Sequence, residues 1–583
     1  MVKPYRLFLS NEDLAFEGIF YKKFIELGEK RRYHIFYKQM LDRAGKGDGV
    51  MGKDKGYKQK TGRGQERGRA LRRRGRRATR VIFSRVGLIA LLLLVEMAMM
   101  LVVVFRAAEA WPPIWGGTAV LSFVMAIYLL NVRMDPTAKV TWLLVILIFP
   151  VLGAALFLYT RSDIGHRVLK RRVLAVTEAD RTRMPATYPA EQAFLREDAR
   201  AAALLTYLRK SGCFPVFEQT EVTYFPSGEE KFAALLAALE QAKRFIFLEY
   251  FIIAEGEMWG QILDILTRKA AEGVDVRVIY DGTCAFSSLS FDYQKRLEKM
   301  GIRCKIYAPI TPFVSTYYNY RDHRKILVVD GEVAFNGGVN LADEYINAVP
   351  RFGHWKDTAL MLRGDAVVSF TMMFLQMWEL DEKNPPHHDL LTLPTSLPQK
   401  PGGFVIPYGD CPLDDYKTGE RVYMDILNRA ERYVHIMTPY LILDGEMENA
   451  LQYAAERGVE VSLILPGIPD KKMPYALAKT YYNSLLEAGV QIYEYTPGFV
   501  HAKVFVADDR EAVVGTINLD YRSFYHHFEC ATYLYRVPCI QEIEADFAET
   551  RAKCRRVTDK TWKQEPLLRR LCGALMKALA PLL

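Results

Sequence analysis

Two segments of the sequence each combine an imidazole, an ammonium group and a carboxylate at the same spacing. The pattern H-x-K-x4-D occupies residues 323–330 and again residues 501–508, and G-[GT]-x-N follows each copy six residues later. Side chains two positions apart on a strand share one face, so each histidine lies beside its lysine. Exchange of a phosphodiester needs a nucleophile, an acid for the leaving alcohol and cations around the phosphoryl oxygens. The candidate catalytic residues are His323, Lys325, Asp330, His501, Lys503 and Asp508.

The pattern is strong evidence for a catalytic site only because it occurs twice. A single copy would occur by chance in about one of twenty or thirty chains of this length, and a satisfied core histidine beside a solvated lysine would explain it equally well. Two copies with the same downstream G-x-x-N exclude coincidence. The four mostly apolar residues between each lysine and aspartate predict a buried strand, and Asp330-Gly331 and Asp508-Asp509 predict hairpin turns.

The elements that position these residues are expected in the same order around both segments. Those before the first segment are a helix over 231–243, a strand over 244–253, a helix over 259–272, a strand over 274–280, a helix over 293–300 and a strand over 303–307. Those before the second are helices over 422–432, 447–457 and 475–488 and strands over 433–443, 459–465 and 490–495. This order predicts two pseudo-symmetric α/β lobes, produced by duplication, whose half-sites meet in one cleft.

The chemistry divides between the two histidines of such a cleft. One attacks phosphorus and forms a phosphohistidine, while the other protonates the leaving alcohol and then deprotonates the incoming one. A histidine pKa of about 6.5 suits both tasks. The residues expected to hold the nonbridging oxygens are Lys325, Lys503, Asn340 and Asn518. Asp330 and Asp508 lie too far along their strands to touch the same phosphate, so we expect them to orient other groups or to form ion pairs.

Shifts in composition predict the domain boundaries. We expect an N-terminal extension over 1–80, which is basic and disordered from residue 53, and then a transmembrane region over 81–162. A connecting segment over 163–212 leads to a first lobe over 213–380. A Pro-rich linker over 381–402, a second lobe over 403–561 and an amphipathic C-terminal helix over 562–583 follow. For the last helix, an interfacial position on a membrane and packing on the second lobe remain equally open.

Three apolar segments in the transmembrane region, 86–105, 114–132 and 140–159, are each long enough to cross a bilayer. They predict a multi-pass protein of the cell membrane. Basic residues before position 86 and after position 159 both favour the cytosol, and three spans cannot place both flanks there. We expect the catalytic part on the cytoplasmic side. Either one of the three segments does not cross the bilayer, or one of the two basic flanks lies on the other side despite its charge.

The charge of the chain restricts its partners. A net charge of +10 and a pI of about 8.9 indicate an anionic partner, either acidic lipid or nucleic acid. The eight cysteines show neither C-x-x-C nor zinc-site spacing and are expected to be reduced thiols. Because no clustered carboxylate site is present either, we expect neither a metal nor another cofactor.

The two segments HRKILVVDGEVAFNGGVNLADEY and HAKVFVADDREAVVGTINLDYRS resemble the phospholipase D superfamily, and within it the bacterial cardiolipin synthases. The resemblance covers about residues 114–583. It implies two phospholipase D-like α/β lobes preceded by an N-terminal transmembrane helical region, with His323 as the nucleophile and His501 as the acid and base. The residues alone do not rank the two histidines. By the same resemblance, further candidates for the headgroup pocket are Glu529, Asp357, Glu249, Tyr250, Tyr440 and His354, although core packing explains the tyrosines equally well.

Three functions compete on these observations. The first is a membrane transphosphatidylase that makes cardiolipin from two phosphatidylglycerols and releases glycerol. The second is a phosphodiesterase that hydrolyses phospholipid or nucleic acid, and the third is a basic membrane scaffold without activity. The intact motifs disfavour the scaffold, and the membrane segments favour lipid. We therefore expect phosphatidylglycerol, other anionic phospholipids and the bilayer as partners, and no nucleic acid.

Overall fold

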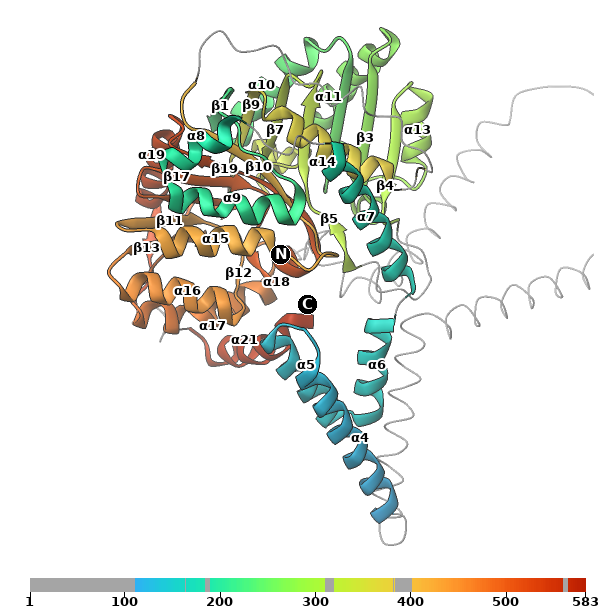
Figure 1. The fold of residues 1–583 in the computed structure, drawn as a ribbon, viewed down its shortest axis with the longest axis vertical. Coiled ribbons are helices and arrows are strands. Elements are labelled where there is room, and N and C mark those ends of the chain that lie inside the picture. The colour runs from blue at the N-terminus through green and yellow to red at the C-terminus, as the bar shows by residue number, and fades with distance from the viewer. Residues whose placement is uncertain are drawn as a thin grey trace, which may run out of the picture. The chain divides into compact units, whose positions relative to one another are not determined.

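The computed structural model describes residues 111–162, 164–183, 189–309, 319–380, 382, 401–558 and 565–582 (Figure 1). The predicted extension over 1–80, the first predicted membrane segment over 86–105 and most of the predicted linker over 381–402 lie outside these residues. The description therefore begins with the second apolar segment.

Three apolar helices precede the α/β part of the chain: α4 (Trp111–Asn131), α5 (Pro136–Ile148) and α6 (Pro150–Ser162). The prediction of one continuous segment over 140–159 is wrong, because the chain reverses at Phe149. Pro150 cannot donate a helical hydrogen bond and its ring clashes with the preceding turn, so a new helix begins there. The ring centres of Trp142 and Phe157 lie 5.2 Å apart across the reversal.

Among the described residues, no helix has both the length and the apolar character needed to cross a bilayer. Helix α5 has 13 residues. At 1.5 Å per residue it is about 20 Å long, which is shorter than the roughly 30 Å apolar core of a bilayer.

The predicted connecting segment forms three helices: α7 (Ile164–Arg183), α8 (Pro189–Glu197) and α9 (Ala199–Gly212). Asp198 caps α9 by accepting hydrogen bonds from the backbone N–H groups of Arg200 and Ala201. Helix α7 contacts α14 of the first lobe, and α9 contacts β10 and α15 of the second. The segment therefore packs on both lobes.

The first lobe contains a seven-stranded sheet in the order β1-β9-β7-β6-β2-β3-β4. Its strands are β1 (Thr220–Phe225), β2 (Phe245–Tyr250), β3 (Asp275–Asp281), β4 (Arg303–Tyr307), β6 (Lys325–Val329), β7 (Val333–Gly337) and β9 (Ala359–Gly364). Its helices are α10 (Gly228–Glu240), α11 (Glu257–Ala271), α12 (Cys284–Ser287), α13 (Tyr293–Lys299) and α14 (Val367–Glu379). Ser227 caps α10 through the N–H of Glu230, so this helix begins three residues before the predicted start.

The second lobe repeats this arrangement in the order β10-β19-β17-β16-β11-β13-β14, with β20 added at the edge. Its strands are β10 (Phe404–Asp410), β11 (Tyr433–Met437), β13 (Glu460–Pro466), β14 (Gln491–Tyr495), β16 (Val504–Ala507), β17 (Glu511–Gly515), β19 (His527–Tyr535) and β20 (Cys554–Arg556). Its helices are α15 (Thr418–Arg429), α16 (Gly445–Glu456), α17 (Lys472–Glu487), α18 (Tyr521–Tyr525) and α19 (Ile540–Ala552). Since seven strands correspond one to one, the predicted duplication agrees with the observed topology.

The two sheets meet along the strands that carry the repeated motif. Strand β7 contacts β17 and β19, and β17 also contacts β9. The strands of both motif hairpins are almost wholly buried. The N-terminal ends of β6 and β16 are therefore held in the interior between the lobes.

Two short stretches of backbone pairing join the lobes directly. Strand β5 (Arg321–Asp322) of the first lobe pairs in parallel with the start of β19. Strand β15 (Gly498–Val500) of the second lobe pairs in parallel with β8 (His354–Lys356) of the first. Each stretch ends immediately before one of the motif histidines.

The chain ends in α21 (Leu567–Leu579) and the short 3-10 helix η5 (Ala580–Leu582), within the predicted C-terminal helix over 562–583. Helix α21 packs on α17, and η5 contacts α5. Packing on the second lobe, one of the two expectations for this helix, is therefore observed.

Candidate active site

Both motif aspartates are used in hydrogen bonds to the backbone. Asp330 accepts from the N–H groups of the three residues that lead into β2, at 2.7 to 2.8 Å. Asp508 makes the same three contacts at the start of β11 and also pairs with Arg510 at 3.1 Å. Both aspartates have positive φ, of 55° and 53°, as the expected hairpin turns require. They therefore fix the strand beside each motif, which is the expected orienting role. Among the described residues, Asp508 also forms an ion pair and Asp330 does not.

Each motif histidine is hydrogen-bonded to a carboxylate from the other lobe. The Nδ1 atom of His323 lies 2.9 Å from both carboxylate oxygens of Glu529. The Nδ1 atom of His501 lies 2.7 Å from Oδ2 of Asp357. The sequence predicts that these acids line the headgroup pocket, whereas the structure uses them to orient the histidines. With Nδ1–H donated to the carboxylate, Nε2 retains the lone pair that nucleophilic or base chemistry needs.

The backbone pairing between the lobes causes this crossed arrangement. The N–H of His323 donates to the carbonyl of Phe528 at 2.9 Å, and the N–H of His501 donates to the carbonyl of Lys356 at 2.7 Å. Each histidine thus stands next to the residue that follows its partner carbonyl, which is Glu529 in one case and Asp357 in the other. Four side chains from distant parts of the chain are placed by two backbone contacts.

Both motif lysines turn back toward their own histidines. Nζ of Lys325 donates to the carbonyl of His323 at 2.6 Å, and Nζ of Lys503 donates to the carbonyl of His501. Burial lowers the pKa of Lys325 to about 8 and that of Lys503 to about 7. Because a phosphate anion would favour the charged forms, the site can bind an anion strongly in its interior.

Burial also lowers the pKa of both histidines. The pKa of His323 lies well below its usual range, because burial acts together with the charges of Lys325, His527 and Lys503. Burial and the charge of Lys503 lower the pKa of His501 to about 4, although Asp357 opposes this change. At neutral pH both imidazoles of the free protein are therefore neutral.

The two motif asparagines differ in their contacts. Asn340 accepts from the N–H of Ile252 at 3.1 Å and donates to the hydroxyl of Tyr345 at 2.7 Å, so most of its amide is used within the first lobe. Oδ1 of Asn518 is buried and has no hydrogen-bond partner among the described residues. Of the two, Asn518 is thus the better placed to receive a group of the substrate.

The carboxylates have different surroundings at equivalent positions. A side chain at Gly338 would collide with Asp357, so the first motif needs glycine there. The second motif has Thr516 at this position, and its hydroxyl donates to Glu529. At equivalent positions, the first lobe therefore has the short Asp357 beside a glycine, and the second lobe has the longer Glu529 beside a threonine.

Three of the remaining residues predicted for the headgroup pocket make their contacts away from the motif histidines. Glu249 is buried behind the first motif, 3.7 Å from Arg324, and burial raises its pKa well above the usual range. The hydroxyl of Tyr250 accepts from buried Lys231 at 3.1 Å. His354 contacts Tyr495 at 3.1 Å. None of these contacts involves a motif histidine.

Tyr440 lies nearer to the second motif. Its hydroxyl donates to Asp470 at 2.5 Å, and its side chain lines a narrow pocket together with Phe499. The ring of Phe499 is 5.9 Å from that of His501. A position beside the substrate is thus compatible with the contacts of Tyr440.

Several aromatic neighbours of the histidines were not predicted. The ring centres of Phe251 and His527 lie 4.9 and 5.1 Å from that of His323, and Trp355 lies 5.3 Å from His501. His527 and Trp355 each stand two residues before an orienting carboxylate. The rule that alternate strand residues share a face would have found both.

One group of side chains in the described residues has the spacing of a metal site, namely His323, His527 and Glu529. Hydrogen bonds already occupy part of this group. Glu529 accepts from His323, and Nε2 of His527 lies 3.3 Å from Nε of Arg522. These contacts place Glu529 and His527 around the first histidine, while Nδ1 of His527 has no hydrogen-bond partner among the described residues.

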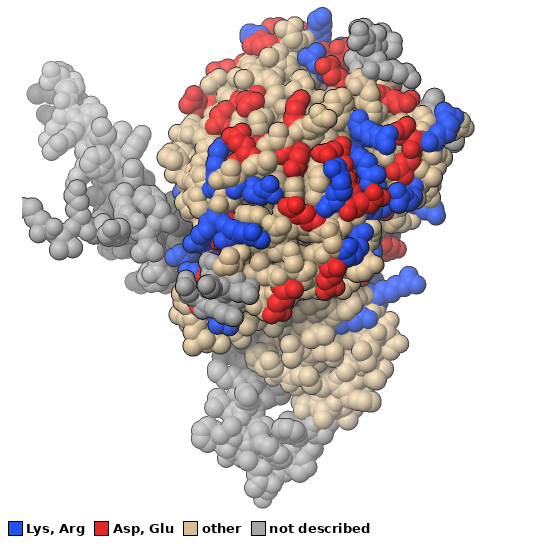
Figure 2. Space-filling view, turned by 90° about the vertical axis from the view of Figure 1, so that its left-hand side faces the viewer, with Lys and Arg blue, Asp and Glu red and all other residues tan. Residues whose placement is uncertain are grey.

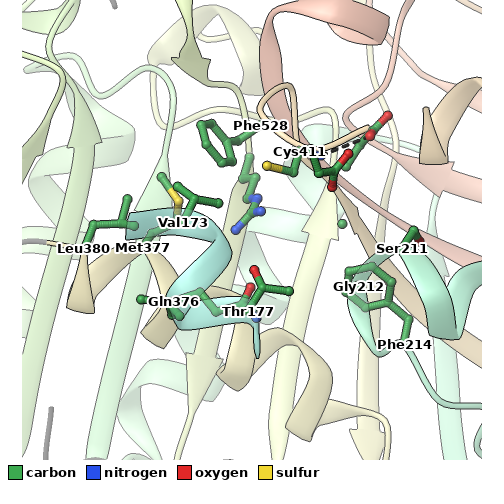
Figure 3. A pocket seen from close by; sticks show the side chains of 15 residues that line it. Val173, Thr177, Ser211, Gly212, Phe214, Gln376, Met377, Leu380, Cys411 and Phe528 are labelled. Atoms are coloured by element: carbon green, nitrogen blue, oxygen red, sulfur yellow. Dashed lines mark hydrogen bonds between the residues drawn. The ribbon is translucent and has the colours of Figure 1, made fainter. Parts of the chain in front are cut away.

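A small cavity of about 40 Å³ lies on the opposite side of the first motif strand (Figure 3). Cys411, Phe528 and Gln376 line it together with Arg324. The guanidinium of Arg324 donates to the carbonyls of Met373 and Glu529 at 3.2 and 3.3 Å. A volume of this size holds one or two water molecules, so this cavity does not accommodate a lipid headgroup.

Comparison with known proteins assigns the chain to a family. Residues 235–351 and 423–551 both match the family described as "Cardiolipin synthase, PLD-like domain". A cardiolipin synthase of Alkalihalophilus pseudofirmus is 33% identical over 476 residues, which cover 80% of this chain and 94% of that protein. The chain belongs to the cardiolipin synthase family of the phospholipase D superfamily. As a cardiolipin synthase family member, it is a phosphatidyl-transferring enzyme.

Other relatives extend the comparison of this family member. Residues 120–161 match the family described as "Phospholipase_D-nuclease N-terminal". Cardiolipin synthase 2 of Bacillus cereus is 32% identical over 80% of this chain and 90% of its own. An uncharacterized protein of Streptococcus mutans is 59% identical over 78% of this chain and 99% of its own. The crystal structure of phosphatidylserine synthase from Haemophilus influenzae shares the fold, with a TM-score of 0.50 and 16% identity over 65% of this chain and 97% of that one.

The crossed carboxylates lead to the first prediction. Asp357→Asn and Glu529→Gln should each lower kcat by about 100- to 10,000-fold with little change in KM, because an amide no longer fixes the tautomer of its histidine. Steady-state kinetics on a soluble phosphodiester would measure this. Glu544→Gln is the matched control, since Glu544 holds His435 at the same 2.9 Å, stacked on Phe547 of α19. Equal losses in all three variants would mean that the effect is one of folding.

The buried lysines lead to a second prediction, on pH. Since burial lowers the pKa of Lys503 to about 7 and that of Lys325 to about 8, the charge that attracts phosphate is present below these values and lost above them. We therefore expect kcat/KM, which reports the free enzyme, to fall as the pH rises from about 7 to 9. Lys503→Arg, whose guanidinium stays charged, should shift this fall to higher pH. A wild-type profile that is flat up to about pH 10 would contradict the role of the lysines.

Proposed function

We propose that this chain is a membrane-bound cardiolipin synthase that transfers a phosphatidyl group from one phosphatidylglycerol to another and releases glycerol. The observation that carries the proposal is the crossed pairing of His323 with Glu529 and of His501 with Asp357. It gives two imidazoles, each with one nitrogen committed to a carboxylate. Relatives named cardiolipin synthase support cardiolipin as the product.

In the first half of the proposed reaction, Nε2 of His323 attacks the phosphorus of phosphatidylglycerol. The low pKa of His323 favours the neutral form that this attack requires. The bond from phosphorus to the glycerol oxygen breaks, and His501 in its protonated form gives the proton to that oxygen. The negative phosphate between the motifs raises the pKa of His501 when substrate binds, which opposes the effect of its burial.

In the second half, His501 takes a proton from the terminal glycerol hydroxyl of a second phosphatidylglycerol. The oxygen attacks the phosphohistidine, the phosphorus–nitrogen bond breaks and His323 is regenerated as cardiolipin forms. Lys325 and Lys503 stabilise the nonbridging oxygens in both halves. Oδ1 of Asn518, which has no partner among the described residues, can accept a hydrogen bond from a hydroxyl of the substrate. Hydrolysis, the alternative, differs only in that water replaces the second lipid.

The preference for lipid over nucleic acid rests on the apolar helices that precede the lobes. Helices α4 to α6 expose large apolar side chains, among them Phe123 and Leu147. Arg161 lies in the last turn of α6, and Arg167 and Lys170 follow in α7, which supports a catalytic part on the cytoplasmic side of the cell membrane. The active site would then lie close to the surface that contains its substrate.

Product analysis tests the proposed function. Purified protein should convert labelled phosphatidylglycerol in vesicles into cardiolipin and glycerol in equal amounts, as separated by chromatography and identified by mass spectrometry. His323→Ala and His501→Ala should each abolish turnover and serve as controls for contaminating activity. Phosphatidic acid as the main product would make the chain a hydrolase instead.

Trapping of the phosphoenzyme tests the roles of the two histidines. With an activated phosphodiester, whose leaving group needs no proton, His501→Ala should form an acid-labile and base-stable adduct on His323 and then stall. His323→Ala should form none. Mass spectrometry of peptides covering 321–330 would locate the adduct. An adduct on His501 in the wild-type protein would reverse the two roles, and its absence under all conditions would indicate direct displacement.

A further inference from the structure

Helix α21 carries an apolar face that the described residues leave uncovered. Five leucines of this helix have between 43% and 74% of their surface exposed. At 100° per residue they fall within a sector of about 120° on one side of the helix. These residues, called here the leucine face, are Leu567, Leu568, Leu571, Leu575 and Leu579.

The opposite side of α21 is packed tightly on the second lobe. Gly573 is buried against α17, where an added Cβ would lie 2.5 Å from the carbonyl oxygen of Ala476. On the same side, Nζ of Lys577 lies 4.0 Å from the ring centre of Tyr481 and 3.6 Å from Glu448. These contacts fix the rotation of the helix about its axis, so the leucine face points away from the second lobe.

The end of α21 is also bound to the apolar helices. The hydroxyl of Thr141 in α5 donates to the carbonyl of Ala578 at 2.9 Å, and η5 contacts α5. Thr141 lies in the second turn of α5, just after the charged turn over 132–135 that joins α4 to α5, where Asp135 caps α5. A charged turn between two apolar helices marks the level at which such helices meet water. Helix α21 is attached at this level.

Beyond this level, α4 to α6 expose mainly apolar side chains. Those with more than half of their surface exposed are Val120, Phe123, Val124, Leu130, Val140, Leu147 and Ile148. In Figure 1, α21 runs along the lower edge of the second lobe, below α17, on the side from which α4 to α6 extend. Figure 2 shows Lys, Arg, Asp and Glu gathered on the upper part of the molecule and a tan surface on the lower part.

We propose that α21 is an interfacial helix that lies in the headgroup region of a phospholipid bilayer, with its leucine face in the acyl boundary. The α17 contacts then hold the second lobe, and with it the active site, at a fixed height above the lipid. Continuity with the apolar surface of α4 to α6 favours a bilayer over a second copy of the chain as the occupant. The inference rests on the proposed function for its choice of lipid.

Spin labels on the full chain in nanodiscs of phosphatidylcholine and phosphatidylglycerol test this position. The label is attached at Leu575→Cys in a Cys572→Ser background, because Cys572 is exposed on the same helix. We expect this label to be more accessible to oxygen than to a water-soluble nickel chelate. A matched label at Leu195→Cys, on α8, should show the reverse order, since Leu195 is also half exposed but distant in sequence from the leucine face. Equal accessibility to the chelate at both positions would overturn the proposal. Spin–spin broadening that disappears when unlabelled protein is added would also overturn it, because it would show that a second copy of the chain covers the leucine face.

A functional variant gives a second readout. Leu571→Gln with Leu575→Gln should lower the rate on phosphatidylglycerol vesicles several-fold, through a higher apparent KM, and leave hydrolysis of a soluble activated phosphodiester unchanged. The soluble substrate reports that the variant is folded. Unchanged activity on vesicles would contradict the inference. Since label accessibility does not depend on turnover, a helix buried in lipid without cardiolipin formation would refute the proposed function alone.

Discussion

The site depends on two short backbone contacts between the lobes. Where β5 meets β19 and β15 meets β8, each motif histidine is placed beside a carboxylate that belongs to the other half of the chain. Neither lobe contains a complete pair by itself. The orientation of both imidazoles, and with it every later chemical step, follows from the register of these contacts, because a shift of one residue would turn the carboxylate to the opposite face.

Burial gives this arrangement its electrostatic character. Two lysines, two histidines and two carboxylates share an interior where charge is costly unless it is paired. The cost appears in the lowered pKa of Lys503 and of both histidines. In the proposed reaction, an incoming phosphodiester would supply the missing negative charge and so favour the charged forms of the lysines.

The sequence predicts what local rules govern. Alternation along a strand places His323 beside Lys325, and repetition of the elements predicts two matching sheets. Local rules do not predict that Glu529 orients His323, because this contact depends on pairing with a strand about two hundred residues away in the chain. The acceptor role of Asp330 has the same origin, since its partners lie at the start of β2, about 85 residues earlier in the chain. For the third apolar segment hydropathy alone suggests one helix, although Pro150 was a visible signal for the reversal.

Gly338 and Thr516 show what joining two lobes in one chain permits. In a symmetric dimer of identical lobes, both histidines would face the same carboxylate and the same neighbour. Here a short acid beside glycine serves His501, and a long acid held by a threonine hydroxyl serves His323. Covalent fusion therefore frees each half to change separately, and two residues that began as copies can specialise in different steps of one reaction.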